Sequence, residues 1–306
     1  MAKVLVTGGA GFIGSHLVEA LVKAKHDVVV LDDLSTGHES NLAGVKSKIR
    51  FIRGDICDPG ALRKAVSGQE YVFHLAAVPS VPYSIEHPLE TQEINTTGTL
   101  NLLIASKEAK VKRFIYASSA AVYGDEPSLP KTELSPLRPQ TPYALQKLAS
   151  EQYTLMFSRI YGMETVALRY FNVYGPRQDP KSPYSGVITK FVTCLKKGEQ
   201  PTVFGDGMQT RDFVYVTDVV QANLKAMTAV HASGKVFNIA TGVQVSIKEM
   251  LAHLNEVLNT KISPKYAAKQ AGDIVHSVAD ISEAKKVLHF HPDVPFHEGI
   301  DQTVKS

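Results

Sequence analysis

The chain has 306 residues, of which 44% are hydrophobic and 21% are charged, so its composition is that of a globular protein rather than of a disordered or fibrous one. Its 33 basic and 30 acidic residues give a formal charge of +3, too small to favour nucleic acid as a partner. Two cysteines exclude a disulfide framework and a cysteine-rich zinc site, and no apolar run of about 18 residues occurs that would cross a membrane. With no leader-like start, we expect a reduced, cytoplasmic protein without a membrane segment.

Short β-branched runs alternate with helical spacing through the first three quarters of the chain. Strands are predicted at residues 4–7, 28–32, 49–53, 71–75, 113–118 and 165–170. Between them, apolar residues recur at helical intervals, as in Ile13, Leu17 and Leu21. Several strands are apolar throughout, which is typical of a parallel sheet with helices on both faces. The pattern predicts an α/β fold built around a doubly wound parallel sheet.

After about Gly175 the pattern loosens. Four prolines separate shorter elements there: Pro176, Pro180, Pro183 and Pro201. Two more strands and an amphipathic helix are predicted at residues 213–216, 236–240 and 247–258. We therefore predict a first domain at residues 1–174, to which residues 212–240 return, and a smaller α/β lobe at residues 175–306.

The clearest local motif joins the first strand to the first helix. Residues 4–14 place glycines at positions 8, 9, 11 and 14, which read either as GxGxxG from Gly9 or as GxxGxxG from Gly8. Such glycines permit a tight turn and close approach of the backbone to a pyrophosphate, and the helix start offers free N–H groups to the anion. A glycine string alone can be a structural turn. Its position after an N-terminal strand favours a dinucleotide site.

Acidic residues after the second and third strands indicate which dinucleotide is bound. Asp32 ends the second strand 24 residues after Gly8, where a carboxylate would hold the adenosine ribose. Asp32 and Asp33, with no nearby arginine, would repel a 2′-phosphate, so NAD is favoured over NADP. Asp55 either reaches the adenine edge or caps the helix that begins near Pro59.

A possible catalytic set follows in the middle of the chain. Tyr143 and Lys147 lie four residues apart at the start of a predicted helix and therefore share one face. An ammonium group one turn away and a cationic nicotinamide would both favour the tyrosine phenolate. Ser118 and Ser119 end a sheet strand upstream. A hydroxyl, a tuned tyrosine and a lysine are what hydride transfer at a secondary alcohol needs. Tyr-x-x-x-Lys alone is common on helix surfaces, so this hypothesis depends on the dinucleotide loop and the serines.

Taken together, these motifs resemble the extended short-chain dehydrogenase/reductase family and, within it, the nucleotide-sugar 4-epimerases. The resemblance spans essentially the whole chain, in residues 7–14, 32–37, 74–77, 118–119, 122–124, 143, 147, 169–177, 204–207, 211–216, 272–273 and 279–280. It implies a Rossmann-type sheet that binds NAD at residues 1–174 and a UDP-sugar-binding lobe at residues 175–306.

The resemblance also implies roles for individual residues. Ser119 and Tyr143 would handle the proton, and Lys147 would bridge Tyr143 and the nicotinamide ribose. Cofactor contacts are implied for Gly8, Gly11, Phe12, Ile13, Gly14, Asp32, Asp33, Ser35, Thr36, Gly37, Asp55, Ile56, Leu75, Ala76, Ala77, Asn95, Ser118, Tyr143, Lys147 and Tyr170. Substrate contacts are implied for Ser119, Tyr143, Asn172, Val187, Thr202, Phe204, Arg211, Asp273 and Ser277.

In the lobe, Phe204 would pack on uracil, Arg211 would meet the diphosphate, and Asp273 would bind the second ribose. Many relatives have an arginine on the diphosphate where this chain has Lys269 and Gln270. Either Lys269 replaces that arginine or Arg211 acts with less help.

The implied reaction interconverts UDP-glucose and UDP-galactose. Tyr143 would take the proton of the sugar 4-hydroxyl while the 4-hydrogen leaves as hydride to NAD, and the 4-keto sugar would turn over and take the hydride back on its other face. Dehydratases and decarboxylases of the superfamily carry an acidic residue just after the first hydroxyl residue. This chain has Ala120 and Ala121 there, so the epimerase is favoured.

The resemblance implies that the residue at position 277 limits the size of the sugar. Relatives with a tyrosine there exclude an N-acetyl group, whereas the small Ser277 leaves room for one. UDP-N-acetylglucosamine is therefore expected as well as UDP-glucose. UDP-glucuronate ranks below both, since Asp179 would repel a uronate if it faced the sugar.

Two other functions stay open: a catalytically silent NAD-binding regulator, which would not need the intact Ser119, Tyr143 and Lys147 set, and a simple NAD-dependent dehydrogenase. The apolar rows at residues 100–105 and 148–160 imply a homodimer or ordinary packing. His289, His291 and His297 have no obvious acidic partner, so no metal site is expected.

Overall fold

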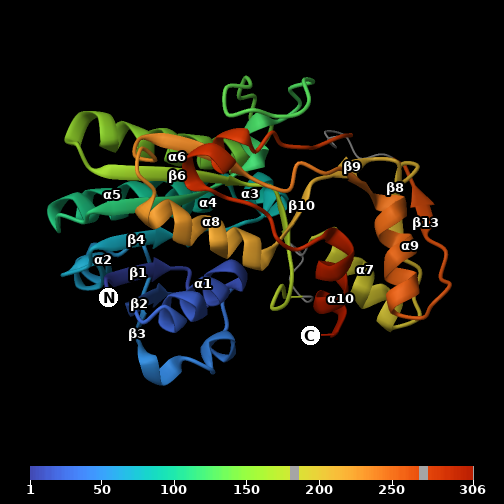
Figure 1. Ribbon diagram of the computed structural model, residues 1–306, viewed down its shortest axis with the longest axis horizontal. Coiled ribbons are helices and arrows are strands. Elements are labelled where there is room, and N and C mark those ends of the chain that lie inside the picture. Colours follow the sequence, from blue (N-terminus) through green and yellow to red (C-terminus); the bar gives the residue numbers. More distant parts are fainter. Residues whose placement is uncertain (180–185, 269–274, 306) are drawn as a thin grey trace.

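The computed structural model describes residues 1–179, 186–268 and 275–305. Its centre is a seven-stranded parallel sheet in the order β11-β6-β5-β4-β1-β2-β3 (Figure 1). The strands are β1 (Lys3–Thr7), β2 (Asp27–Asp32), β3 (Ile49–Arg53), β4 (Tyr71–His74), β5 (Arg113–Ser119), β6 (Glu164–Tyr170) and β11 (Lys235–Ile239). The six strands predicted up to residue 170 are therefore present, each within one residue at either end. The predicted fold class is confirmed.

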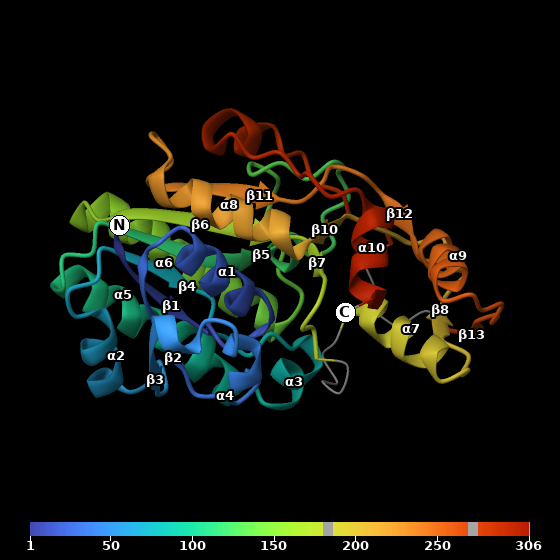
Figure 2. The ribbon, with the colours of Figure 1, turned by 60° about the horizontal axis from the view of Figure 1, so that its bottom comes forward.

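Helices cover both faces of this sheet, as the apolar strands require. The helices α1 (Phe12–Lys23) and α8 (Val216–Thr228) pack on one face around Val18, Val30 and Phe237. The other face is covered by α2 (Pro59–Val66), α5 (Thr99–Glu108) and α6 (Pro142–Tyr161) (Figure 2). Beside α6 lie α3 (Val81–Glu86), α4 (Pro88–Gln92) and the π-helical turn η3 (Glu93–Gly98). Short turns η1 (Glu39–Leu42), η2 (Lys46–Lys48) and η4 (Ala120–Tyr123) follow strands or loops.

The strand order reverses at β1, which lies between β4 and β2. The connections on its two sides therefore leave in opposite directions, and a crevice forms beyond the carboxyl ends of these strands, where open α/β sheets bind ligands. The glycine loop lies at this edge, directly after β1.

The start of α6 is defined by its sequence. The Thr141 side chain accepts a hydrogen bond from the Ala144 N–H, and Pro142 occupies the first turn, where its missing N–H costs nothing. At the other end Gly162 takes the left-handed conformation, with φ of 66°. These caps place Tyr143 in the first helical turn and Lys147 one turn later.

The smaller lobe has its own apolar core around Phe191, Leu254 and Ile300. It contains α7 (Val187–Lys196), α9 (Ile247–Val257), α10 (Phe296–Lys305) and the paired strands β8 (Thr202–Phe204) with β13 (Lys265–Ala267) and β9 (Thr210–Arg211) with β12 (Val245–Ser246). It lies at the right of Figure 1.

Between the two parts the chain passes back to the sheet. The strand β10 (Phe213–Tyr215) pairs with β7 (Asn172–Tyr174), α8 packs on α1, and β11 joins the sheet at β6. The turn η5 (Ala284–Leu288) also packs against α8 and β11, and Phe290 is buried in the same core. This return therefore continues beyond residue 240. The division at residue 174 stays a prediction.

Candidate functional site

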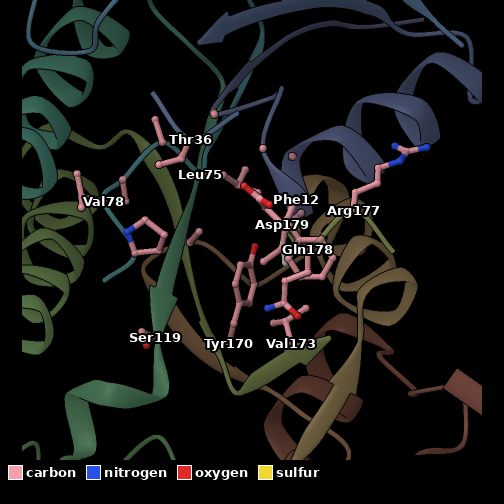
Figure 3. A pocket seen from close by; sticks show the side chains of 18 of the residues that line it. Phe12, Thr36, Leu75, Val78, Ser119, Tyr170, Val173, Arg177, Gln178 and Asp179 are labelled. Atoms are coloured by element: carbon pink, nitrogen blue, oxygen red, sulfur yellow. The ribbon is translucent and has the colours of Figure 1, made fainter. Parts of the chain in front are cut away.

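A cavity of about 450 Å³ opens at the carboxyl ends of the central strands. Its size is in the range of small-molecule sites. Residues at or just after the carboxyl ends of β1, β2, β3, β4 and β5 line it, together with the start of α6 and the segment after β7 (Figure 3). All residues predicted to contact the cofactor lie on its wall except Gly37 and Asn95.

The glycine loop resolves which of the two registers faces the cavity. Gly8, Gly11 and Gly14 line the cavity, whereas a Cβ on Gly9 would lie 2.7 Å from the Val30 side chain in the core. Gly8 has φ of 69°, and a Cβ on Gly14 would lie 2.0 Å from the Gly8 carbonyl oxygen. The loop is therefore a cradle that a side chain would fill, and α1 begins there with no side-chain cap on its free N–H groups. These features fit a pyrophosphate.

Asp32 joins this loop to the end of β2. Its carboxylate accepts hydrogen bonds from the N–H groups of Ala10 and Leu34, both at 2.9 Å. Burial raises the pKa of Asp32, while these two bonds lower it. Gly37 lies behind the carboxylate, where a Cβ would come within 3.0 Å of Asp32 Oδ1. Gly37 thus lets the loop pass close to Asp32, and the structure does not place it on the cavity wall.

Asp55 has two predicted roles, and the structure decides against one of them. The residue that caps α2 is Asp58, whose side chain accepts a hydrogen bond from the Gly60 N–H at 2.7 Å. Asp55 lines the cavity and accepts the Cys57 N–H at 2.8 Å. The capping interpretation of Asp55 is therefore wrong, because α2 begins at Pro59 and its N-cap position is occupied by Asp58.

The predicted catalytic residues meet at the junction of β5 and α6. The Ser119 hydroxyl accepts the Ala121 N–H at 3.2 Å. Burial raises the pKa of Tyr143, and the neighbouring Ser119 hydroxyl lowers it. Lys147 Nζ donates to the Ala117 carbonyl at 2.8 Å, and burial lowers its pKa to about 8. All three side chains line the cavity.

Two residues predicted to contact the cofactor have other partners. The Ser118 hydroxyl lies on the cavity wall but donates to Glu151 Oε2 at 2.7 Å. Asn95 lies behind the wall, where its amide bonds the backbone N–H and carbonyl of Val78 and the side chain of Gln146. Asn95 therefore holds the segment that lines the cavity at Val78, and it does not line the cavity itself.

The wall that follows β7 contains Arg177 and Gln178, to which the sequence motifs assign no individual role, and Asp179, which the sequence suggests only as a group facing a uronate. Arg177, Gln178 and Asp179 line the cavity, and Figure 3 shows them on the side next to α1. Arg177 Nη2 lies 2.7 Å from Glu19 Oε1 on α1, and Asp179 lies 3.5 Å from His38. His38 directly follows the loop that is expected to hold the adenosine ribose, so Asp179 lies beside that loop.

The predicted substrate residues lie in two groups. Asn172 and Val187 line the cavity. Thr202, Phe204, Arg211 and Ser277 lie on the lobe, outside the cavity wall. There the Thr210 carbonyl accepts both the Ser277 N–H at 3.1 Å and Arg211 Nη1 at 2.8 Å, so these two predicted residues are neighbours. Asp273 and Lys269 lie outside the described residues.

Comparison with known proteins identifies the family. The model of the NAD dependent epimerase/dehydratase family matches residues 4–240. The chain belongs to this family. NAD is therefore its cofactor, as predicted, and the glycine cradle and Asp32 fit it.

Individual members of the family align over nearly the full length. A UDP-glucose 4-epimerase of Mycolicibacterium smegmatis is 38% identical, over 99% of this chain and 97% of its own. A UDP-N-acetylglucosamine 4-epimerase of Methanobrevibacter ruminantium, solved with UDP-N-acetylmuramic acid, superposes with a TM-score of 0.95 at 42% identity, over 99% of this chain and 97% of that one. A UDP-glucose 4-epimerase of Thermotoga maritima, solved with UDP-glucose, gives 0.94 at 39% over the same shares. The similarity supports an enzyme that acts on UDP-sugars.

Within the described ranges, no helix is long and apolar enough to span a membrane. The same part of the chain contains no group of three or more His, Cys, Asp or Glu residues arranged to hold a metal ion.

Proposed function

We propose that this protein is a UDP-hexose 4-epimerase that interconverts UDP-glucose and UDP-galactose, and also UDP-N-acetylglucosamine and its 4-epimer. The observation that carries the proposal is the contact between Ser119 and Tyr143 at the wall of the NAD cavity, one turn from Lys147. Ala120 and Ala121 are the first two residues of η4, so the chain has no carboxyl group at these positions to eliminate water.

NAD bound in the cavity supplies the hydride acceptor for C4 of the sugar. The chain supplies the proton chemistry. The Ser119 oxygen already accepts the Ala121 N–H, so its hydroxyl proton is available to donate to the phenolate of Tyr143 or to the sugar oxygen. This donation and the positive charge of Lys147 favour the phenolate, which removes the proton of the 4-hydroxyl.

Two observations support the acetylated substrate. Ser277 is small and lies beside Arg211, the residue expected on the diphosphate. In addition, the structural relative at 42% identity is a UDP-N-acetylglucosamine 4-epimerase. UDP-glucuronate is the alternative substrate and ranks below the two neutral sugars.

The proposal is tested by NMR of the purified protein incubated separately with UDP-glucose, UDP-N-acetylglucosamine and UDP-glucuronate. Formation of the 4-epimer from both neutral sugars is the expected result. Tyr143→Phe is the control, which should retain NAD and form no epimer. If wild type leaves all three sugars unchanged while binding NAD, the proposal fails and the silent-regulator hypothesis takes its place.

We also propose that two copies pair through α4, α5 and α6. Much of the predicted apolar rows is buried in the fold, but several large apolar side chains on α4, α5 and α6 are exposed: Leu89, Ile104, Leu145 and Ile160. Because α4 and α5 both pack against α6, these side chains lie on adjoining elements, and exposed apolar side chains that gather in this way are typical of an interaction surface. Light scattering after gel filtration should give twice the chain mass, and Leu145→Glu with Ile160→Glu should give a monomer. A wild-type monomer would contradict the pairing.

A further inference from the structure

Three consecutive residues at the end of β5 each face a different turn of α6. The Ala117 carbonyl accepts Lys147 Nζ at 2.8 Å, and the Ser118 hydroxyl donates to Glu151 at 2.7 Å. The Ser119 hydroxyl neighbours the Tyr143 side chain and lowers its pKa. The three helical partners are spaced four residues apart, so they form one stripe along α6. Tyr143 and Lys147 belong to the proposed catalytic set. Glu151 is the third helical partner and has no role in that set.

Glu151 is buried completely and is held on a second side. Its two carboxylate oxygens accept Arg169 Nη2 at 2.7 Å and Nε at 2.9 Å, a bidentate pair between α6 and β6. Arg169 also donates to the Tyr123 hydroxyl at 2.8 Å, which in turn donates to Asn238 on β11 at 2.6 Å. Glu151 is therefore the point where α6, β5 and a buried polar network meet.

We propose that Glu151 is a positioning residue, which fixes the register of β5 against α6 and thereby holds the Ser119 hydroxyl against the Tyr143 phenol. Its role in the reaction rests on the proposed function. Ser119 follows Ser118 directly, so a shift of Ser118 along the helix moves Ser119 as well. A displacement of about 1 Å in a catalytic group costs about 100-fold in rate.

Loss of Glu151 would also have a signature on the titration of Tyr143. Because the neighbouring Ser119 hydroxyl lowers the pKa of Tyr143, moving that hydroxyl away raises the pKa. Tyr116 of β5 interacts electrostatically with Tyr143, Lys147 lies one turn along α6, and α3 faces the Tyr143 N–H with the Ser84 hydroxyl at 3.0 Å. None of these groups is replaced in Glu151→Gln. A shift in the pKa of Tyr143 therefore reports a change in the position of the Ser119 hydroxyl.

The matched control is an ion pair that joins the same two strands at their other ends. Arg113 begins β5, Glu164 begins β6, the two residues are paired in the sheet, and Arg113 Nη2 lies 2.6 Å from Glu164 Oε2. Glu164→Gln weakens a bond between β5 and β6 without touching the stripe. It should leave both the kinetics and the titration of Tyr143 as in wild type.

The experiment compares NAD-loaded wild type, Glu151→Gln and Glu164→Gln. The titration of Tyr143 is read from tyrosinate absorbance as the difference from the same protein carrying Tyr143→Phe. We expect Glu151→Gln to move this titration to higher pH, and to lower kcat about 100-fold at neutral pH with KM for the UDP-sugar within about twofold. Lower thermal stability with an unchanged titration and an unchanged kcat per bound NAD would overturn the proposal.

Ser118→Ala provides a second variant in case Glu151→Gln does not fold. It breaks the link to β5 and leaves the Glu151–Arg169 ion pair intact, so the same shift is expected, and an unchanged titration would again overturn the proposal. The titration needs no substrate. If wild type epimerises no sugar, the proposed function fails while the positioning by Glu151 is still decided.

Discussion

Lys147 Nζ lies 2.8 Å from the carbonyl oxygen of Ala117, in a site where that side chain is almost fully buried. Burial of this ammonium group lowers its pKa to about 8, from an ordinary value of 10.5. In the folded protein without cofactor, the charged form of Lys147 therefore lowers the free energy of unfolding. The neighbouring phenolate and the bound substrate would offset this loss.

This cost predicts a pH dependence of stability. Between pH 8 and 10.5 the unfolded state binds more protons at Lys147 than the folded state does, so the free energy of unfolding gains a contribution that rises with pH. The gain is up to about 3 kcal/mol over this interval. Urea denaturation of the cofactor-free protein at several pH values should show it for wild type and not for Lys147→Met. Parallel curves for the two proteins would contradict the assignment.

His74 should lower the stability of the folded protein at acid pH. It is buried between the hydroxyls of Thr7 and Thr99, and burial lowers its pKa to about 3. Below pH 6.5 the unfolded chain takes up a proton that the folded one does not, so stability falls by about 1.4 kcal/mol per pH unit as the pH drops toward 3. His74→Gln, whose amide can bond both hydroxyls, should flatten this slope in urea titrations at pH 7 and pH 5. An unchanged slope would mean that His74 is not buried in the neutral form.

The glycine cradle predicts a loss of cofactor. A Cβ in Gly14→Ala would lie 2.0 Å from the Gly8 carbonyl oxygen, so the loop must move away from the pyrophosphate position. We expect the variant to be purified without NAD and to lose about 1–3 kcal/mol of stability from overpacking. Gly44→Ala is the control, since its nearest neighbour would be 3.8 Å away. Full NAD content in Gly14→Ala, measured by absorbance after denaturation, would refute the cradle.

The segment after β7 should slow the release of NAD. A variant that detaches this segment from α1 should therefore release NAD faster than wild type. The Glu19–Arg177 pair holds this wall of the cavity to α1, and both side chains are partly exposed. A pair of that kind contributes about 0.5–1 kcal/mol, so Glu19→Gln should release NAD about two- to fivefold faster. Fluorescence of NADH displaced by excess NAD measures the rate, and Arg177→Gln should add nothing in the Glu19→Gln background. Additive effects would show that the two residues act separately.

Much of the fold could be predicted because it depends on local patterns. The continuous apolar runs of β2 and β5 and the caps of α6 specify those elements without reference to distant residues. The choice between the two glycine registers could not be made in this way. It depends on Val30, a residue of β2 whose side chain occupies the space beside Gly9.

The placement of Tyr143 and Lys147 on one face of α6 could be predicted for the same reason, since the two residues are related by one helical turn. Asp179 and Glu151 illustrate what could not. Asp179 pairs with a residue from a loop far away in the sequence, and Glu151 matters because Arg169 and Ser118 approach it from two different strands. Partners brought together only by the tertiary fold leave no spacing signal in the sequence.

The most direct measurement of the central claim uses UDP-glucose deuterated at C4, incubated with the NAD-loaded protein in ordinary water. Transient oxidation at C4 with return of the same hydride predicts UDP-galactose that keeps its deuterium at C4, with no NADH released to solution. The account is contradicted if NADH accumulates in proportion to the sugar consumed, as for a simple dehydrogenase, or if the product carries hydrogen from water at C4.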